Sequence, residues 1–185
     1  MQGVIALGNP GKKYEKTRHN VGWMVIDAVV GKTAKWDMNK KFNALVLRQD
    51  DVLFVKPLTF MNASGEAVHR VLKMYSLRPA DLLLVHDDSD MLLGRMKLAA
   101  GGSSGGHRGM QSVFDHLHTQ EFVRLKVGVR PIQTQGRSDT FVTKKFSFGE
   151  RGAKKVAVAR AAEAVTFFLQ NGAAATMNIF NRNEN

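Results

Sequence analysis

The stretch MQGVIALGNPGKKYEKTRHNVGWMVIDAVV, residues 1–30, holds a strand, a turn, a polar loop and a helix in chain order. The apolar run at residues 4–7 ends at Gly-Asn-Pro-Gly, which is typical of a buried strand stopped by a turn. Apolar residues then recur at helical spacing over residues 20–34, so we expect a helix there. The polar loop between strand and helix carries Asn9 at one end and His19 at the other.

The rest of the chain continues this alternation of strands and helices. Further helices are predicted over residues 62–75, 110–118 and 153–170. Strands are predicted over residues 82–86, 95–100 and 124–130, and as a hairpin of 42–48 with 52–56. Residues 141–148 fit a short strand or a loop, and 131–140 a mobile loop. We therefore predict an α/β fold in a single domain over residues 1–185: a three-layer α/β/α sandwich around a mixed, mostly parallel twisted sheet.

The composition narrows the class of protein. Of the 185 residues, 44% are hydrophobic and 23% charged, as in ordinary globular proteins. The absence of cysteine excludes disulfides, thiolate catalysis and Cys-ligated zinc. The N-terminus lacks the features of a signal peptide, and no apolar run approaches the roughly 20 residues that span a bilayer. We expect a cytoplasmic protein without a membrane partner.

The net charge is the most informative bulk property. Twenty-seven Lys and Arg against sixteen Asp and Glu give +11, which favours a polyanionic partner, with nucleic acid ahead of an anionic membrane. A solubility charge spread evenly is the alternative, but residues 121–160 concentrate the cations. They are Arg124, Lys126, Arg130, Arg137, Lys144, Lys145, Arg151, Lys154, Lys155 and Arg160. Aromatic residues do not alternate with these cations as in a stacking platform, so we expect contacts to the nucleic-acid backbone.

His19 has both a structural and a chemical interpretation. A lone histidine in a loop is more often held there by hydrogen bonds, next to an Asn20 that could cap the helix. A neutral imidazole can instead accept a proton from water as a general base. That role requires a carboxylate on its other nitrogen to fix the tautomer and the orientation.

The stretch HDDSD, residues 86–90, offers Asp87, Asp88 and Asp90 as that carboxylate. Asp87 is the first residue after the predicted strand and is therefore best placed at the sheet edge, where α/β folds build sites. Clustered carboxylates also bind magnesium, but three acids in one short loop make a poor octahedral site. In a third interpretation the acids only form a turn and a helix cap.

Two further motifs carry residues suited to binding. In FMNASG, residues 60–65, Asn62 fits a helix N-cap, and its amide can also hold a water or a carbonyl oxygen. GGSSGGHRG, residues 101–109, resembles a phosphate cradle of backbone N–H groups, with a flexible gating loop as the equal alternative. It is not a Walker A loop, and no GxSxG nucleophile elbow occurs in the chain.

Four motifs together resemble bacterial-type peptidyl-tRNA hydrolase in their order and spacing. They are GNPG..Y..TRHN within 7–20, FMN.SG at 60–65, HDD.D at 86–90 and GGH.G at 105–109. The resemblance covers essentially the whole chain. It implies a monomeric α/β hydrolase, without metal, cofactor or obligate protein partner, that cuts the ester between the peptide and the 3′-terminal ribose of tRNA.

The resemblance also implies residue roles. His19 matches the family's base, Asp87 the carboxylate that orients it, and Asn9 the residue linked to distinguishing N-blocked from free aminoacyl groups. Asn62 matches the residue that positions substrate and water, so neutral His19 would take a proton from a water held with its help. The other positions that match crevice or tRNA contacts are Tyr14, Phe60, Met61, Gly106, His107, Lys97 and Lys126.

One position departs from the family pattern. Arg108 stands where the family commonly has asparagine, and arginine is longer, permanently charged and has no hydrogen-bond acceptor. It could bind the 3′ backbone of tRNA or narrow the crevice. A noncatalytic RNA-binding relative of the same fold, of the kind that acts in splicing, is the alternative function. The presence of Asn9, His19, Asn62 and Asp87 favours the enzyme.

Overall fold

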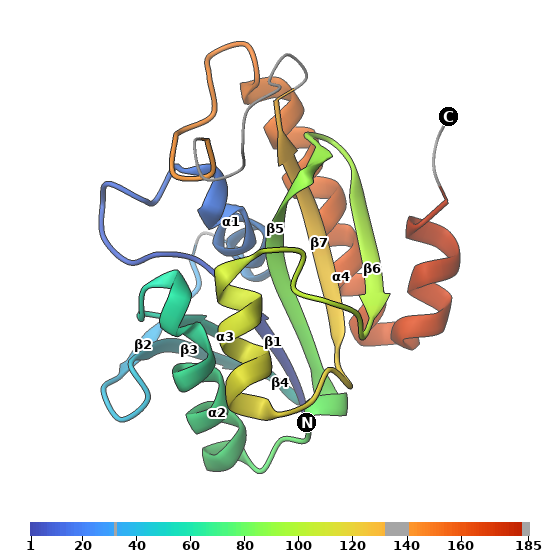
Figure 1. The fold of residues 1–185 in the computed structure, drawn as a ribbon. Helices are drawn as coiled ribbons and strands as arrows, with labels where there is room; N and C mark the ends of the chain where they lie inside the picture. Colours follow the sequence, from blue (N-terminus) through green and yellow to red (C-terminus); the bar gives the residue numbers. More distant parts are fainter. Residues whose placement is uncertain (32, 132–140, 183–185) are drawn as a thin grey trace.

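The computed structural model describes residues 1–31, 33–131 and 141–182. Seven strands form one sheet in the order β2-β3-β4-β1-β5-β7-β6 (Figure 1). They are β1 (Gln2–Ala6), β2 (Asp37–Asn39), β3 (Ala44–Gln49), β4 (Val52–Pro57), β5 (Leu82–Leu92), β6 (Met96–Ala100) and β7 (Val123–Arg130). The central strands β4, β1, β5 and β7 are parallel, and β2, β3 and β6 join through antiparallel pairings. The predicted mixed sheet is confirmed.

Helices cover both faces of this sheet. They are α1 (Val21–Val30), α2 (Ser64–Tyr75), α3 (Arg108–Leu117) and α4 (Arg151–Phe180), with the 3-10 turns η1 (Arg18–Asn20), η2 (Met61–Ala63) and η3 (Pro79–Asp81). Figure 1 shows α1 and α4 on one side of the sheet and α2 and α3 on the other. The three-layer α/β/α architecture is therefore confirmed.

The strand sequences explain why both faces are covered. In β1, Val4 and Ala6 belong to the core beneath α1 and α4, whereas Ile5 and the following Leu7 belong to the core beneath α2 and α3. The fully buried run at residues 82–85 of β5 alternates between the same two cores. A central parallel strand buried on both sides has to be apolar at every position, which is the pattern of residues 4–7 and 82–85.

Gly22 brings α1 unusually close to the sheet. A Cβ atom at this position would lie 2.7 Å from the carbonyl oxygen of Val85 and 2.9 Å from that of Leu7. Only glycine tolerates this approach of helix to strand ends, because no side chain fits between them. The close packing places η1, and with it His19, directly beside the carboxyl ends of β1 and β5.

Some predicted element bounds were wrong. β5 does not end at residue 86 but continues through the acids to Leu92, because pairing with β7 extends past Asp87 and Asp88 before the register shifts. This pairing overrides the low strand propensity of aspartate. The final helix runs from Arg151 to Phe180, across a non-helical Gly172. The short strand β2 was missed.

Two predicted helix caps were also wrong. Asn62 lies within η2, the N-cap of α2 is Ala63, and no side chain caps that helix. Asn20 occupies the N-cap position of α1, but its side chain makes no capping bond and turns to Asn9 instead.

Residues 141–148 are a loop apart from an isolated bridge between Thr17 and Lys145. The loop predicted at 131–140 lies outside the described residues beyond residue 131. No helix in the described part of the chain has the length and apolar character needed to cross a bilayer.

Candidate active site

A pocket of about 220 Å³ opens at the carboxyl ends of the parallel strands, where α/β sheets commonly bind ligands. Its walls come from η1, the end of β5, the glycine-rich loop before α3, β7 and the segment after residue 140. The residues that line it are His19, His86, Asp87, Asp88, Ser89, Asp90, Ser104, Gly105, Gly106, His107, Arg108, Lys126, Val142 and Thr143. Segments far apart in the sequence thus build one site.

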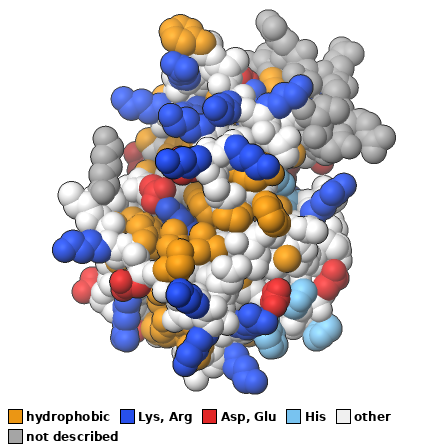
Figure 2. All heavy atoms as spheres, turned by 90° about the vertical axis from the view of Figure 1, so that its left-hand side faces the viewer, with side chains coloured by type: hydrophobic (Ala, Val, Ile, Leu, Met, Phe, Trp, Pro, Cys, Tyr) orange, Lys and Arg blue, Asp and Glu red, His pale blue; other side chains and the backbone are white. Residues whose placement is uncertain are grey.

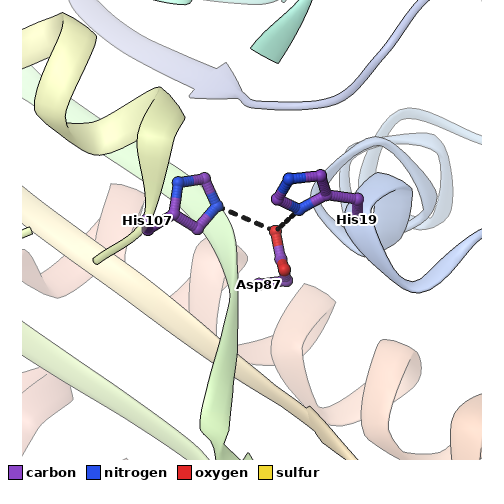
Figure 3. A group of neighbouring side chains, drawn as sticks. All are labelled: His19, Asp87 and His107. Atoms are coloured by element: carbon purple, nitrogen blue, oxygen red, sulfur yellow. Dashed lines mark hydrogen bonds and ion pairs between the residues drawn. The ribbon is translucent and has the colours of Figure 1, made fainter. Parts of the chain in front are cut away.

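Asp87 lines the pocket and has a histidine on each side (Figure 3). Its Oδ1 atom lies 2.7 Å from Nδ1 of His19 and 2.9 Å from Nε2 of His107. Asp87 is only 1% exposed at its side chain, whereas His19 is 13% exposed and reaches the pocket. The structure therefore brings together His19 and the carboxylate that the sequence favoured, and adds a second histidine.

The backbone fixes the tautomer of His107. Its Nδ1 atom accepts hydrogen bonds from the N–H groups of Gly109 and Met110, at 3.1 and 3.2 Å, and so caps helix α3. A nitrogen that accepts these bonds carries no hydrogen, so the ring hydrogen lies on Nε2 and is donated to Asp87. Because His107 already occupies these N–H groups, the start of α3 is not an open anion cradle.

His19 is oriented as a general base requires. A carboxylate only accepts hydrogen bonds, so Nδ1 of His19 donates to Asp87 and the lone pair of the neutral ring lies on Nε2. Figure 3 shows this second nitrogen turned away from Asp87. Burial lowers the pKa of His19, but the charge and hydrogen bond of Asp87 outweigh burial and the repulsion of Arg108, and the pKa lies above 6.5. A raised pKa makes the neutral ring a stronger base.

Asp87 stays ionised and His86 stays neutral. Burial would raise the pKa of Asp87, but His19 and His107 lower it far below the usual range through their charges and hydrogen bonds. Burial lowers the pKa of His86 to about 3, helped by His107. His86 donates from Nδ1 to the backbone oxygen of Asp87 at 2.8 Å and packs edge-on against the His107 ring. It therefore supports the backbone of Asp87 and the ring of His107.

Asn9 is tied to the loop that carries His19 and to the 60–65 motif. Its backbone N–H and carbonyl each bond the side chain of Asn20 at 2.9 Å, which closes the loop that carries His19. Its Oδ1 atom accepts a hydrogen bond from the N–H of Met61 at 2.8 Å. The last bond uses the acceptor end of the Asn9 amide and leaves its NH₂ end as a possible donor, although Asn9 is buried and does not itself line the pocket.

The other residues of the 60–65 motif extend this edge. Met61 is buried against Gly109, where any Cβ would collide with its sulfur atom, and thus packs beside His107. Phe60 is 57% exposed and meets Tyr14 edge-on, with ring centroids 6.3 Å apart. The Asn62 side chain is exposed and has no hydrogen-bond partner among the described residues. It is free to meet a ligand, but it does not line the pocket itself.

Arg124 holds the glycine-rich loop against the sheet. This residue is 2% exposed, and its guanidinium donates to the carbonyl oxygens of Ser103, at 2.8 Å, and Gly101. The anchored stretch leads to Gly106 and Arg108, which line the pocket. Arg108 is exposed, and its charge acts on His19. Arg124 belonged to the basic segment in the sequence, but no local signal distinguished it as a buried anchor.

Lys97 and Lys126 lie directly opposite each other on neighbouring strands β6 and β7. Lys126 bonds the Asp88 carboxylate at 3.0 Å and lines the pocket, while Lys97 is exposed. Like charges in facing positions are destabilising by themselves. The Asp88 carboxylate offsets part of the positive charge of this pair.

Among the described residues, one group has the spacing of metal ligands: His19, Asp87 and His107. Their possible ligand atoms lie within 4.8 Å of one another. This group is not the acidic cluster considered from the sequence, because Asp88 is bonded to Lys126 and to backbone N–H groups. The separations of 2.7 and 2.9 Å are hydrogen-bond lengths, and the tautomer of His107 places a hydrogen in one of them. The geometry therefore fits two N–H donors on one carboxylate oxygen.

Comparison with known proteins identifies the family of the chain. The sequence model of the family described as Peptidyl-tRNA hydrolase matches residues 3–185. The chain belongs to the peptidyl-tRNA hydrolase family. The peptidyl-tRNA hydrolase of Brevibacillus brevis is 45% identical over 98% of each chain, and that of Listeria welshimeri 40% identical over 98% of this chain and all of the relative.

Solved structures give the same result for the fold. A crystal structure of peptidyl-tRNA hydrolase from Acinetobacter baumannii matches with a TM-score of 0.88 at 30% identity, covering 98% of this chain and 95% of that one. Membership of the peptidyl-tRNA hydrolase family makes the protein an ester hydrolase. The noncatalytic RNA-binding alternative is not favoured.

Proposed function

We propose that this protein hydrolyses the ester between a peptide and the 3′-terminal ribose of tRNA, with His19 as the general base. The observation that carries the proposal is the bond from Nδ1 of His19 to buried, ionised Asp87, which leaves Nε2 free to accept a proton. The family match and the net charge of +11 on the chain support peptidyl-tRNA as the substrate. The reaction releases tRNA from peptidyl-tRNA left by stalled translation.

The reaction begins with a water at Nε2 of His19, held with help from the exposed Asn62 amide. His19 takes a proton from this water as the oxygen attacks the ester carbonyl carbon, and Asp87 stabilises the imidazolium that forms. The tetrahedral intermediate then expels the ribose 3′ oxygen, which receives the proton from His19. Amide or backbone donors at the crevice stabilise the negative oxygen of the intermediate, and the Asn9 NH₂ group is one candidate.

The residues at the crevice edge have binding roles in this proposal. Asn9 faces the acyl group and distinguishes an N-blocked from a free amino acid, while Tyr14, Phe60 and Met61 contact the aminoacyl part. Arg108 lies on the glycine-rich loop and meets a phosphate of the tRNA 3′ end. We infer a monomer that works in the cytoplasm, where translation supplies its substrate.

The direct test is hydrolysis of N-acetylaminoacyl-tRNA by the wild-type protein. We expect turnover of this substrate and far slower turnover of the same aminoacyl-tRNA with a free amino group. Release of the labelled amino acid from tRNA measures both rates. Tight binding of tRNA without any turnover would instead identify a noncatalytic RNA-binding relative.

A second prediction concerns the facing pair Lys97 and Lys126. An enzyme that serves all tRNAs binds them largely through phosphates, so its affinity falls steeply with salt. We expect Lys97→Gln or Lys126→Gln to reduce the slope of log Kd against log salt by about one, as for the loss of one phosphate contact. Binding of uncharged tRNA at several salt concentrations measures the slope. Lys73→Gln, an exposed lysine on α2, is the control, and slopes unchanged in both test variants would place the phosphate contact elsewhere.

A further inference from the structure

Residues 141–150, here called the strap, are fastened to the loop that carries the base. The backbone N–H of His19 donates to the carbonyl oxygen of Val142 at 2.8 Å, and that of Arg18 to Lys144 at 3.0 Å. Val142 also lines the catalytic pocket, followed by Thr143. The strap therefore leads directly from the pocket wall out to the surface.

The outer part of the strap and the start of α4 form a basic surface. Glu150, the acidic residue of the strap, forms an ion pair with Arg18 at 2.7 Å and accepts hydrogen bonds from Ser147. Burial would raise the pKa of Glu150, but these partners lower it to about 2, so its charge offsets that of Arg18. The exposed cations of this surface are Lys144, Lys145, Arg151 and Lys155. Figure 2 shows Lys and Arg side chains gathered in the upper half of the face to which the strap belongs.

One aromatic side chain stands out of this basic surface. The strap contains three phenylalanines, of which Phe141 and Phe146 are buried at 5% and 9% exposure. Phe148 is 82% exposed, the highest value among the large exposed hydrophobic residues of the described chain. The guanidinium of Arg151 lies 4.9 Å from the centre of its ring. Because most of the residue is exposed, the part of the ring that Arg151 does not cover is open to a flat partner.

We propose that Phe148 stacks on an unpaired base of the single-stranded 3′ end of the tRNA, with Arg151 and the strap lysines meeting the neighbouring phosphates. Exposed aromatic rings beside cations are how proteins hold single-stranded nucleic acid without reading its sequence. This inference rests on the proposed function, since the substrate's ester has to lie in the pocket beside His19. It extends that site to nucleotides away from the reacting bond.

The spacing along the strap fits this assignment. Phe148 lies five positions after pocket-lining Thr143, a span of at most about 18 Å. A stacked nucleic-acid strand advances about 3.4 Å per nucleotide. The ring therefore lies within reach of about the first five nucleotides from the ester. An anionic membrane would also suit a basic surface with an exposed ring, but continuity with the catalytic pocket favours the tRNA.

The experiment compares Phe148→Leu and Phe148→Tyr on two substrates. Leucine keeps an apolar side chain without a ring, and tyrosine keeps the ring. The substrates are N-acetylaminoacyl-tRNA and N-acetylaminoacyl-adenosine, which has the same ester but no further nucleotides. Met74→Ala, which changes a 53% exposed side chain on α2, controls for the loss of an exposed apolar group.

We expect Phe148→Leu to raise KM for the tRNA substrate at least about fivefold, from the loss of one stacked base, with kcat unchanged. Phe148→Tyr restores the wild-type KM, and the adenosine substrate does not distinguish the variants. An unchanged KM in Phe148→Leu, or an equal loss on both substrates, would overturn the proposal. If Phe148→Leu kept its KM but sedimented less with phosphatidylserine vesicles than the wild type, the proposal would also fail, and the surface would be assigned to a membrane. Failure of the proposed function itself is separate, because it would abolish wild-type hydrolysis of both substrates.

Discussion

Replacing His19 with alanine lowers kcat for N-acetylaminoacyl-tRNA by about 10² to 10⁴-fold or more, while the Kd for tRNA stays within about twofold of the wild-type value. The loss is that of general-base catalysis, because no other group in the proposed mechanism takes the proton from water. Binding survives because the phosphate contacts lie on other segments. Single-turnover hydrolysis and binding of uncharged tRNA measure the two quantities separately.

The fold of this variant is expected to persist. His19 anchors its loop through its backbone N–H, which alanine retains, and its side chain is not part of either hydrophobic core. His69→Ala, an exposed histidine on α2, is the matched control and should keep full activity. Turnover of His19→Ala near the wild-type rate would remove His19 from the mechanism. Partial rescue by added imidazole would identify the missing group as the base.

The sequence predicted the parts of the fold that depend on strong local patterns. The buried runs at 4–7 and 82–85 are apolar at each position because the sheet is covered on both faces. Their parallel pairing, with Ala6 opposite Val85, brings the residues after each strand to one edge of the sheet. The sequence placed Asn9 and Asp87 at this edge on the same argument, although β5 continues through Asp87 to Leu92, and the pairing of Asp87 with His19 followed from the family resemblance.

Other features of the site depend on contacts that no local pattern encodes. The sequence matched His107 to a substrate contact by resemblance, but gave no sign that it bonds Asp87 or that buried Arg124 holds the glycine-rich loop before it. Asn20 was expected to cap the helix that follows it, yet its side chain bonds the backbone of Asn9 instead of a helix N–H. Likewise, three phenylalanines in one basic segment gave no sign that only Phe148 is exposed.

Asp87→Asn is expected to lower kcat by at least about 10²-fold and to shift the acid limb of the pH–rate profile downward. The wild-type reaction needs neutral His19, so its kcat/KM rises with pH through a pKa above 6.5. Asparagine removes the charge that raises this pKa and leaves burial and Arg108, which both lower it. The variant is therefore neutral at His19 down to lower pH, but its base is weaker and its imidazolium has no carboxylate partner.

The titration of His19 separates this effect from a loss of structure. Following the ring protons of His19 by NMR in folded Asp87→Asn should give a pKa below the wild-type value, with circular dichroism confirming the fold. Asp88→Asn is the control, because Asp88 bonds Lys126 rather than His19, and the pKa should remain above 6.5. A His19 pKa that stays raised in Asp87→Asn would mean that another group orients the base. A pKa that falls in Asp88→Asn by the same amount would mean that the general negative charge of the pocket, and not the hydrogen bond to Asp87, sets its basicity.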